Sequence, residues 1–118
     1  MKQIGTMGKH VGVWVLALAL GACSGESAEM AANAHPGQST YNEACISCHN
    51  PGISGAPRLG DTDAWQARIA KGRRTLVNST INGLNSMPAK GMCSQCTDEE
   101  LGHAVASILE QSGVSAGQ

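Results

Sequence analysis

Cys45-Ile46-Ser47-Cys48-His49 is the stretch from which the rest of this 118-residue sequence can be understood. Two thiols are separated by two residues, and an imidazole follows the second thiol directly. A C-x-x-C pair can be a redox-active disulfide of the thioredoxin kind, which requires a strand–helix context. The alternating pattern typical of strands is absent after residue 36, so this redox interpretation is disfavoured.

The histidine beside the second cysteine favours covalent haem attachment instead. Each thiol can add to one haem vinyl group, and two intervening residues let both sulfurs reach one porphyrin edge. His49 would then lie beneath the iron as a ligand. Zinc remains an alternative, because Cys93 and Cys96 form a second C-x-x-C pair. The long separation of the two pairs disfavours zinc, and the sequence predicts one covalent haem c bound through Cys45, Cys48 and His49.

The amino-terminal segment has the pattern of an export signal. Lys2 and Lys9 supply positive charge ahead of an apolar run over residues 11–20. This run is shorter than the roughly 20 residues of a membrane span. The following Leu-Gly-Ala-Cys23 resembles a bacterial lipobox, which implies lipidation of Cys23 and cleavage before it. We therefore expect a signal peptide at 1–22, a lipidated cysteine with a flexible tether at 23–36, and a domain at 37–118. An ordinary signal peptide with a free Cys23 is the alternative. The expected location is the bacterial periplasm, with a lipid anchor in the membrane.

Charge and composition narrow the function further. Removal of the signal leaves six Lys and Arg residues against nine Asp and Glu residues, which does not suggest a nucleic-acid partner. The remaining chain has no Phe, and its aromatic side chains are Tyr41 and Trp65. A domain this small and this poor in large hydrophobic residues needs a cofactor, a metal or disulfides to complete its core.

The pattern along the chain predicts an all-α domain of about four helices. Three expected helices cover about residues 38–48, 62–71 and 75–82, and a last helix begins at Thr97 and continues at least to Leu109; loops lie at 50–59 and 84–96. Thr62 is the expected N-cap of the second helix. Thr97 and Glu100 form a capping box before the last helix, in which an apolar stripe runs from Leu101 to Leu109.

A second axial ligand for the iron must come from downstream of His49. Met87 is the best candidate, because it lies in a loop and Pro88 stiffens the segment that follows. Met92 is the nearby competitor, and Met30 lies in the tether. His/Met ligation raises the reduction potential and suits electron transfer rather than catalysis.

Cys93 and Cys96 carry no haem in this interpretation. Two cysteines in an oxidising compartment are expected to form a disulfide, here closing a four-residue ring ahead of the last helix. Such a small ring adds little loop-closure entropy, so its expected effect is to stiffen the Met87 loop locally. Every cysteine then has a role, because Cys23 is the lipid site.

The assembled motifs resemble the cytochrome c5-type branch of the class I monohaem cytochromes c. The matching stretches are Tyr41–His49, Gly55–Gly60, Trp65, Ile81–Gly83, Met87–Pro88, Cys93–Cys96 and Thr97–Glu100. The resemblance implies the class I fold wrapped around one haem. It also implies that the Pro57 carbonyl accepts a hydrogen bond from His49, and that Gly55 and Gly60 let the backbone approach the porphyrin. Trp65 would pack beside the haem or serve as a core aromatic residue.

The function that follows is a one-electron carrier in a respiratory chain rather than an enzyme. Its partners would be redox proteins of unknown identity, and the carrier would be a monomer or a weak dimer. A haem subunit or haem-based sensor of a fixed complex is the alternative, followed by a zinc-binding four-cysteine module. The basic residues between Arg68 and Arg74 either dock an acidic partner or form a solvated helix face.

Overall fold

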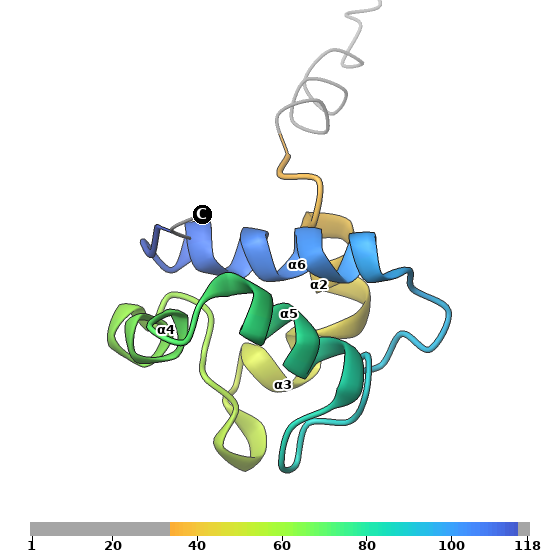
Figure 1. The fold of residues 1–118 in the computed structure, drawn as a ribbon, viewed down its shortest axis with the longest axis horizontal. Coiled ribbons are helices and arrows are strands. Elements are labelled where there is room, and N and C mark those ends of the chain that lie inside the picture. Colours follow the sequence, from red (N-terminus) through yellow and green to blue (C-terminus); the bar gives the residue numbers. More distant parts are fainter. Residues whose placement is uncertain (1–33, 116–118) are drawn as a thin grey trace, which may run out of the picture.

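The computed structural model describes residues 34–115, and this part of the chain is all-α with no strand (Figure 1). The elements are α2 (Gln38–Ala44), α3 (Ile46–His49), a 3-10 turn η1 (Ile53–Gly55), α4 (Thr62–Ile69), α5 (Arg73–Asn82) and α6 (Asp98–Gln111). The predicted all-α class is confirmed, although the described residues form five helices rather than about four. The expected signal peptide, Cys23 and Met30 lie outside the described residues, and no helix within them is long and apolar enough to span a membrane.

The first expected helix, over residues 38–48, is wrong in one respect, because the structure divides it at Cys45. The Ala44 carbonyl accepts a hydrogen bond from the Met92 backbone N–H at 3.2 Å, a partner far along the chain. Cys48 N–H then bonds to the Cys45 carbonyl, at 3.2 Å, rather than one residue earlier. The break lets α3 turn relative to α2, with Cys45 at the junction and His49 at the end of α3.

The expected N-cap of α4 is also corrected. Asp61 rather than Thr62 caps the helix, because its carboxylate accepts the Ala64 backbone N–H at 3.0 Å. The Thr62 hydroxyl donates instead to the Ser112 carbonyl, at 2.8 Å, just beyond the end of α6. The Ser112 hydroxyl in turn accepts the Gly60 N–H at 3.0 Å, so the start of α4 is held by the far end of the chain.

Two further boundaries differ from expectation. The third expected helix begins at Arg73 rather than at residue 75, directly after Gly72, whose φ of 88° is outside the helical range and separates this helix from α4. The loop expected over residues 50–59 contains the 3-10 turn η1, and Ala56, the residue after this turn, has an extended backbone. Neither change alters the order of the expected elements.

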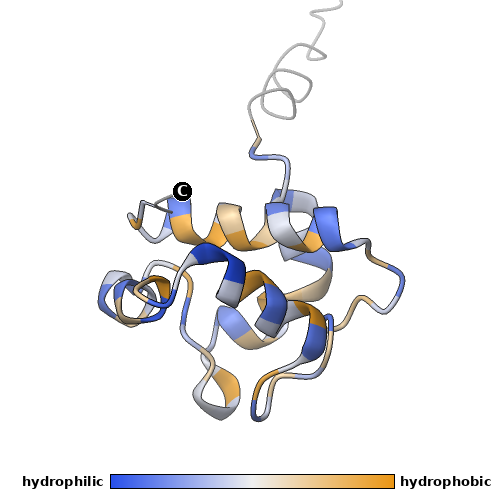
Figure 2. Cartoon of the chain, in the orientation of Figure 1, coloured by the Kyte–Doolittle hydropathy of each residue, from blue (hydrophilic) through white to orange (hydrophobic). Residues whose placement is uncertain are grey.

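Helix α6 matches its prediction closely. Thr97 and Glu100 form the full capping box, and this lowers the pKa of the exposed Glu100 carboxyl because it accepts the Thr97 backbone and side-chain hydrogen bonds. The apolar stripe is buried, with Leu101 and Leu109 fully inaccessible. Figure 2 shows the orange side of α6 turned toward the other helices, so this helix is the central support of the fold.

Helices α2 and α6 cross at Gly37, the residue before α2. A Cβ atom at Gly37 would lie only 1.9 Å from the His103 carbonyl oxygen, so the backbones of the two segments touch directly. The φ of Gly37 is an ordinary −85°, and the requirement for glycine is therefore one of space rather than of backbone conformation. This contact packs the start of the described chain directly against the backbone of α6.

Replacing Gly37 with alanine is expected to lower the free energy of unfolding by about 1–3 kcal/mol, because the crossing is overpacked. Chemical denaturation of the haem-loaded protein measures the change. Gly102→Ala is the matched control, since its Cβ would meet no atom within 4 Å. This control lies inside α6 and should raise stability by about 0.5–1 kcal/mol. Equal effects of the two substitutions would contradict the steric explanation.

Candidate functional site

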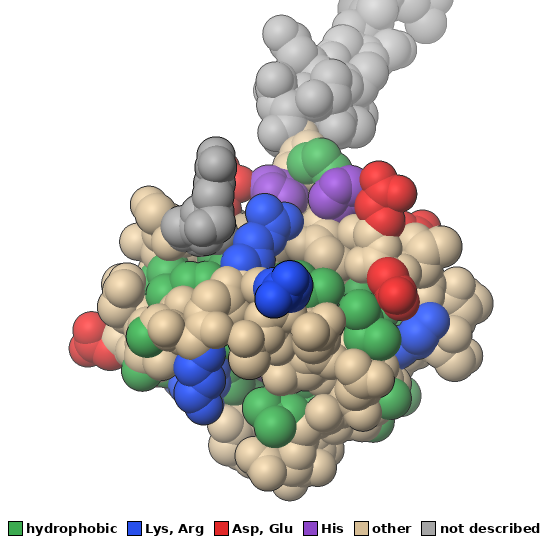
Figure 3. Space-filling model, in the orientation of Figure 1, with side chains coloured by type: hydrophobic (Ala, Val, Ile, Leu, Met, Phe, Trp, Pro, Cys, Tyr) green, Lys and Arg blue, Asp and Glu red, His purple; other side chains and the backbone are tan. Residues whose placement is uncertain are grey.

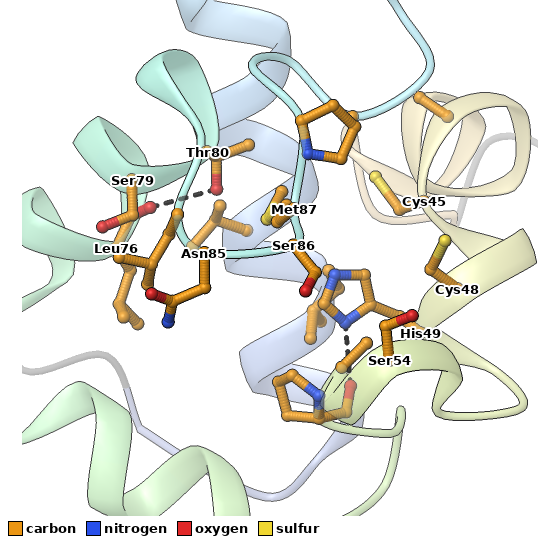
Figure 4. Close-up of a pocket in the computed structure, with 18 of the residues that line it drawn as sticks. Cys45, Cys48, His49, Ser54, Leu76, Ser79, Thr80, Asn85, Ser86 and Met87 are labelled. Carbon is orange, nitrogen blue, oxygen red and sulfur yellow. Dashed lines mark hydrogen bonds between the residues drawn. The ribbon is translucent and has the colours of Figure 1, made fainter.

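The residues that the sequence predicts to hold the haem line one cavity (Figure 4). Cys48 and His49 lie in α3 and Cys45 is the residue before it, whereas Met87 lies in the loop between α5 and α6. The other lining residues come from η1, α4, α5 and α6 and are mostly apolar. Helices distant in sequence therefore surround one apolar space with sulfur and nitrogen ligands on its walls.

The two thiols differ in environment. Cys45 is buried and Cys48 is partly exposed, and neither is in a disulfide. Burial raises the pKa of the Cys45 thiol to about 11, with a smaller contribution from negative charge at Cys48. Cys45 is consequently a neutral thiol at physiological pH. A neutral thiol is a poor ligand for a free metal cation, because metal binding requires the thiolate.

His49 is buried and held in one orientation. Its Nδ1 lies 2.8 Å from the Pro57 carbonyl oxygen, which can only accept, so the ring donates from Nδ1. The lone pair of Nε2 is then free to coordinate iron, and the hydrogen bond to the Pro57 carbonyl fixes the tautomer and increases the basicity of the ring. The His49 carbonyl also accepts the Leu59 N–H at 2.8 Å, which ties the two sides of this loop together.

Trp65 supports the histidine from α4. Its ring centroid lies 5.7 Å from that of His49, and its Nε1 donates to the Arg58 carbonyl at 2.8 Å. The indole is almost fully buried and also lines the cavity, so Trp65 is at once a core residue and a wall of the site. Of the two glycines expected near the porphyrin, Gly55 lines the cavity, whereas Gly60 does not.

The loop after α5 carries Met87 into the cavity wall. Leu84 and Met87 exchange two backbone hydrogen bonds, of 3.0 Å and 2.9 Å, which close a tight turn. A Cβ atom at Gly83 would lie 2.9 Å from the Met87 carbonyl, so the turn folds directly over this glycine. Met87 is half-buried, whereas the competing Met92 is 70% exposed. The geometry thus favours Met87 as the inward sulfur.

Cys93 and Cys96 are joined by a disulfide with a Cα–Cα distance of 5.4 Å, and both are buried. Lys90, in the loop before this disulfide, holds the loop in place through two hydrogen bonds. The Lys90 backbone N–H donates to the Thr80 carbonyl at 2.8 Å, and its Nζ donates to the Cys96 carbonyl at 2.9 Å. The disulfide and these bonds hold the loop that carries Met87 against α5.

Replacing both Cys93 and Cys96 with serine is expected to cost about 2 kcal/mol of unfolding free energy, the low end of the usual disulfide contribution, because the ring closes only four residues. Haem binding should persist, since neither residue faces the cavity. Denaturant unfolding of the two proteins, compared with a Ser94→Ala control inside the same ring, measures the difference. A loss no larger than that of Ser94→Ala would contradict the expectation.

Several wall residues were not identified from the sequence as site residues. Leu76, Ser79 and Thr80 line the cavity from α5, opposite the cysteines (Figure 4). Arg68 lines it from α4, half-buried, with one guanidinium nitrogen 2.8 Å from the Ala64 carbonyl. No carboxylate within residues 34–115 is close enough to pair with Arg68. The only sequence signal for this position is its spacing of three residues from Trp65, which places both on one helix face.

These residues fit a haem group. The walls are largely apolar, two free thiols and one oriented imidazole stand on one side, and a thioether faces the same space. The unpaired Arg68 guanidinium matches the carboxylates that haem carries. The zinc alternative finds no support, because Cys93 and Cys96 are bonded to each other. Moreover, no group of three or more His, Cys, Asp or Glu residues within the described chain could hold a metal ion.

Comparisons with known proteins agree with this chemistry. Residues 32–107 match the sequence family described as "Cytochrome C oxidase, cbb3-type, subunit III". Cytochrome c-555 of Chlorobaculum tepidum is 44% identical over 84 residues, which cover 68% of this chain and 78% of that protein. Cytochrome c5 of Azotobacter vinelandii is 39% identical over 77 residues, covering 64% and 93% respectively.

A solved structure shows the same fold. It is a chain from the crystal structure of an electron transfer complex of nitrite reductase with cytochrome c. That chain matches with a TM-score of 0.62 and 32% identity, over 65% of this chain and 94% of its own length. This chain therefore belongs to the cytochrome c family, as a class I monohaem cytochrome of the c5-like type that transfers electrons on one covalently attached haem c.

Proposed function

We propose that Cys45 and Cys48 bind the haem through thioether bonds and that His49 and Met87 are its axial ligands. The observation that carries this assignment is their convergence on one cavity from two distant segments of the chain, α3 with its N-cap and the loop after α5. Pro57 contributes its carbonyl oxygen, which orients the His49 ring. Met92 is not a ligand in this proposal, because most of its side chain faces solvent.

The bound haem supplies a reversible one-electron change at its iron. The chain's own residues set the conditions for that change. The Pro57 carbonyl holds the proton on Nδ1 of His49, the apolar walls exclude water, and Arg68 provides a positive charge for the haem carboxylates. With both axial positions filled, no open position remains for a substrate, and the proposed role is electron transfer without catalysis.

An absorption spectrum of the protein, produced with haem-maturation machinery, tests this assignment. A sharp reduced alpha band of c-type haem, together with a weak far-red band of Met–iron ligation in the oxidised protein, is the expected result. The absence of a Soret band would reject the haem site altogether. A c-type spectrum without the far-red band would retain Cys45, Cys48 and His49 but reject the Met87 assignment.

We further propose a carrier exported to the bacterial periplasm, with a signal peptide at 1–22, a lipid on Cys23, a tether over 23–36 and the haem domain at 37–118. Its support is the Leu-Gly-Ala-Cys23 pattern and the attachment of c-type haem outside the cytoplasm. Labelling with radioactive palmitate should be lost in a Cys23→Ser variant. Unchanged labelling would reject lipidation at this cysteine.

The proposed partners are electron donor and acceptor proteins of a respiratory chain, which the carrier meets as a monomer or weak dimer. The structural relative found in a complex with nitrite reductase supports an oxidoreductase as one partner class. The family description as an oxidase subunit favours a second candidate, a permanent subunit of a larger complex. Native electrophoresis of detergent-solubilised membranes separates the two, because a shuttle migrates alone and a subunit migrates with its complex.

A further inference from the structure

Arg58 joins two parts of the haem site from outside the cavity. It is exposed and does not line the cavity. Its side-chain Nε donates to the carbonyl of Asn50, the C-cap of α3, at 3.2 Å. Its backbone carbonyl accepts the indole N–H of Trp65, on α4, at 2.8 Å. An exposed arginine is usually a solvated residue, but this one is bound on two sides to elements that surround His49.

Three consecutive residues bind the end of α3, each through a different group. The Pro57 carbonyl accepts from Nδ1 of His49, and the Leu59 N–H donates to the His49 carbonyl, both at 2.8 Å. Arg58 lies between them and supplies the third bond, to the carbonyl of Asn50. Carbonyl groups at the end of a helix have no partner within the helix, so each needs one from outside. The Arg58 side chain therefore closes the loop onto the segment that carries the imidazole.

The loop that this bond closes lies at the surface. No residue between Asn50 and Arg58 is buried, and the backbone is left-handed at Gly52 and Ser54, with φ of 83° and 53°. The arginine stem packs across the first of these turns, because a Cβ atom at Gly52 would lie 3.0 Å from Arg58 Cγ. Burial therefore does not fix the loop. Its path from α3 to the Pro57 carbonyl depends on hydrogen bonds and on the arginine stem that covers it.

No ion pair competes for the Arg58 guanidinium among the described residues. The ion pair found in that part of the chain joins His35 to Glu110, so Arg58 is not bound to a carboxylate there. Figure 3 shows the positive side chains spread over the visible face of the domain rather than gathered at one place. The guanidinium is thus available as a charged donor to the α3 carbonyl. A charged donor forms a stronger hydrogen bond than a neutral one.

We infer that Arg58 is a positioning residue for the axial ligand, because its side chain keeps the Pro57 carbonyl on the Nδ1 proton of His49. This role rests on the proposed function, since it needs His49 on the iron. A firm bond at Nδ1 makes the ring a better electron donor, which favours ferric iron. When the loop moves, the bond lengthens, the ring donates less and the ferrous form gains. Arg58 thereby lowers the reduction potential from outside the cavity.

Arg58→Met tests the inference, since methionine keeps an unbranched stem over Gly52 and lacks the Nε donor. The reduction potential of the haem-loaded variant should rise, so that the ferrous-to-ferric ratio at one applied potential increases about threefold. Loss of a positive charge alone would act in the opposite direction, because it stabilises the more positive ferric haem. A potential that falls, or that stays at the parent value, would overturn the inference.

Hydrogen exchange of the His49 Nδ1 proton, followed by NMR in the ferrous protein, measures the loop directly. In Arg58→Met this proton should exchange with solvent at least about fivefold faster, because one hydrogen bond that closes the loop is gone. Arg74→Met is the matched control, since it removes the same charge from an exposed α5 residue that does not line the cavity. Its exchange rate should stay at the parent value, and its potential should not rise.

Failure of the inference and failure of the proposed function give different results. Exchange at the parent rate in Arg58→Met, with a normal c-type spectrum in both proteins, would overturn the positioning role alone. A parent protein without a Soret band would reject the haem site itself, and the absorption spectrum shows this before any variant is made.

Discussion

Alanine at position 87 is expected to remove the far-red Met–iron band of the oxidised protein, leaving an iron with water or no ligand in the sixth position. A thioether stabilises ferrous iron, so its loss should lower the reduction potential by a sizeable part of the roughly 0.8 V range that axial ligands set. Met87→His should restore a six-coordinate low-spin spectrum at a potential lower than the parent by on the order of 0.1–0.2 V. Spectroelectrochemical titration measures both changes.

Met92→Ala is the control, since Met92 lies five residues further along the same loop and is 70% exposed. Its far-red band should remain and its potential should move little. Carbon monoxide binding gives an independent measure, because an open sixth position in reduced Met87→Ala admits the gas whereas the parent and Met92→Ala do not. If Met92→Ala loses the band and Met87→Ala keeps it, the ligand assignment is reversed.

The second large effect concerns folding. A Cys45→Ala/Cys48→Ala variant is expected to lose covalent haem and, with it, most of its helical circular dichroism. The reason is that α3, α4, α5 and α6 all face the cavity, and few large apolar side chains remain to close it. An unfilled apolar cavity costs stability in proportion to its size, and a domain this small has little to spare.

Two comparisons separate haem loss from general damage. Cys93→Ser/Cys96→Ser also replaces two cysteines, here the disulfide pair away from the cavity, and should keep its haem and its helices. A single Cys48→Ala variant retains one thioether and should fold with reduced stability. A cooperative, fully helical apo-protein from the Cys45→Ala/Cys48→Ala variant would show that the helices alone form a sufficient core.

Local chemistry explains which parts of the fold were predictable. The capping box and apolar stripe of α6 lie between Thr97 and Leu109, and the cysteine–histidine motif lies between Cys45 and His49, so each can be recognised from neighbouring residues alone. The division between α2 and α3 was not predictable, because it depends on the bond from the Met92 N–H to the Ala44 carbonyl. The predicted cap of α4 was wrong for a similar reason, because the Thr62 hydroxyl donates to the Ser112 carbonyl, 50 residues away.

The same limit applies to the cavity. The ligands on α3 belong to a motif, whereas Arg68 and the α5 wall become part of the site only when α4 and α5 fold over it. Left-handed backbone at Ser54 has no sequence signal, because serine seldom adopts it outside an enforcing environment. Asn85 is a more typical left-handed residue, but the sequence does not show that Leu84 and Asn85 line the cavity.

The described chain begins beside α2 and α6, while the loops that follow α3 and α5 lie at the opposite edge (Figure 1). This separation has a geometric consequence for any surface to which the upstream chain is attached. The domain would then lie with the side of the haem cavity lined by Ile53 and Leu84 directed away from that surface and toward the surrounding solvent. Each carrier could then turn and reach a neighbour without first releasing itself from the support, and the length of the tether would set the radius over which electrons are delivered.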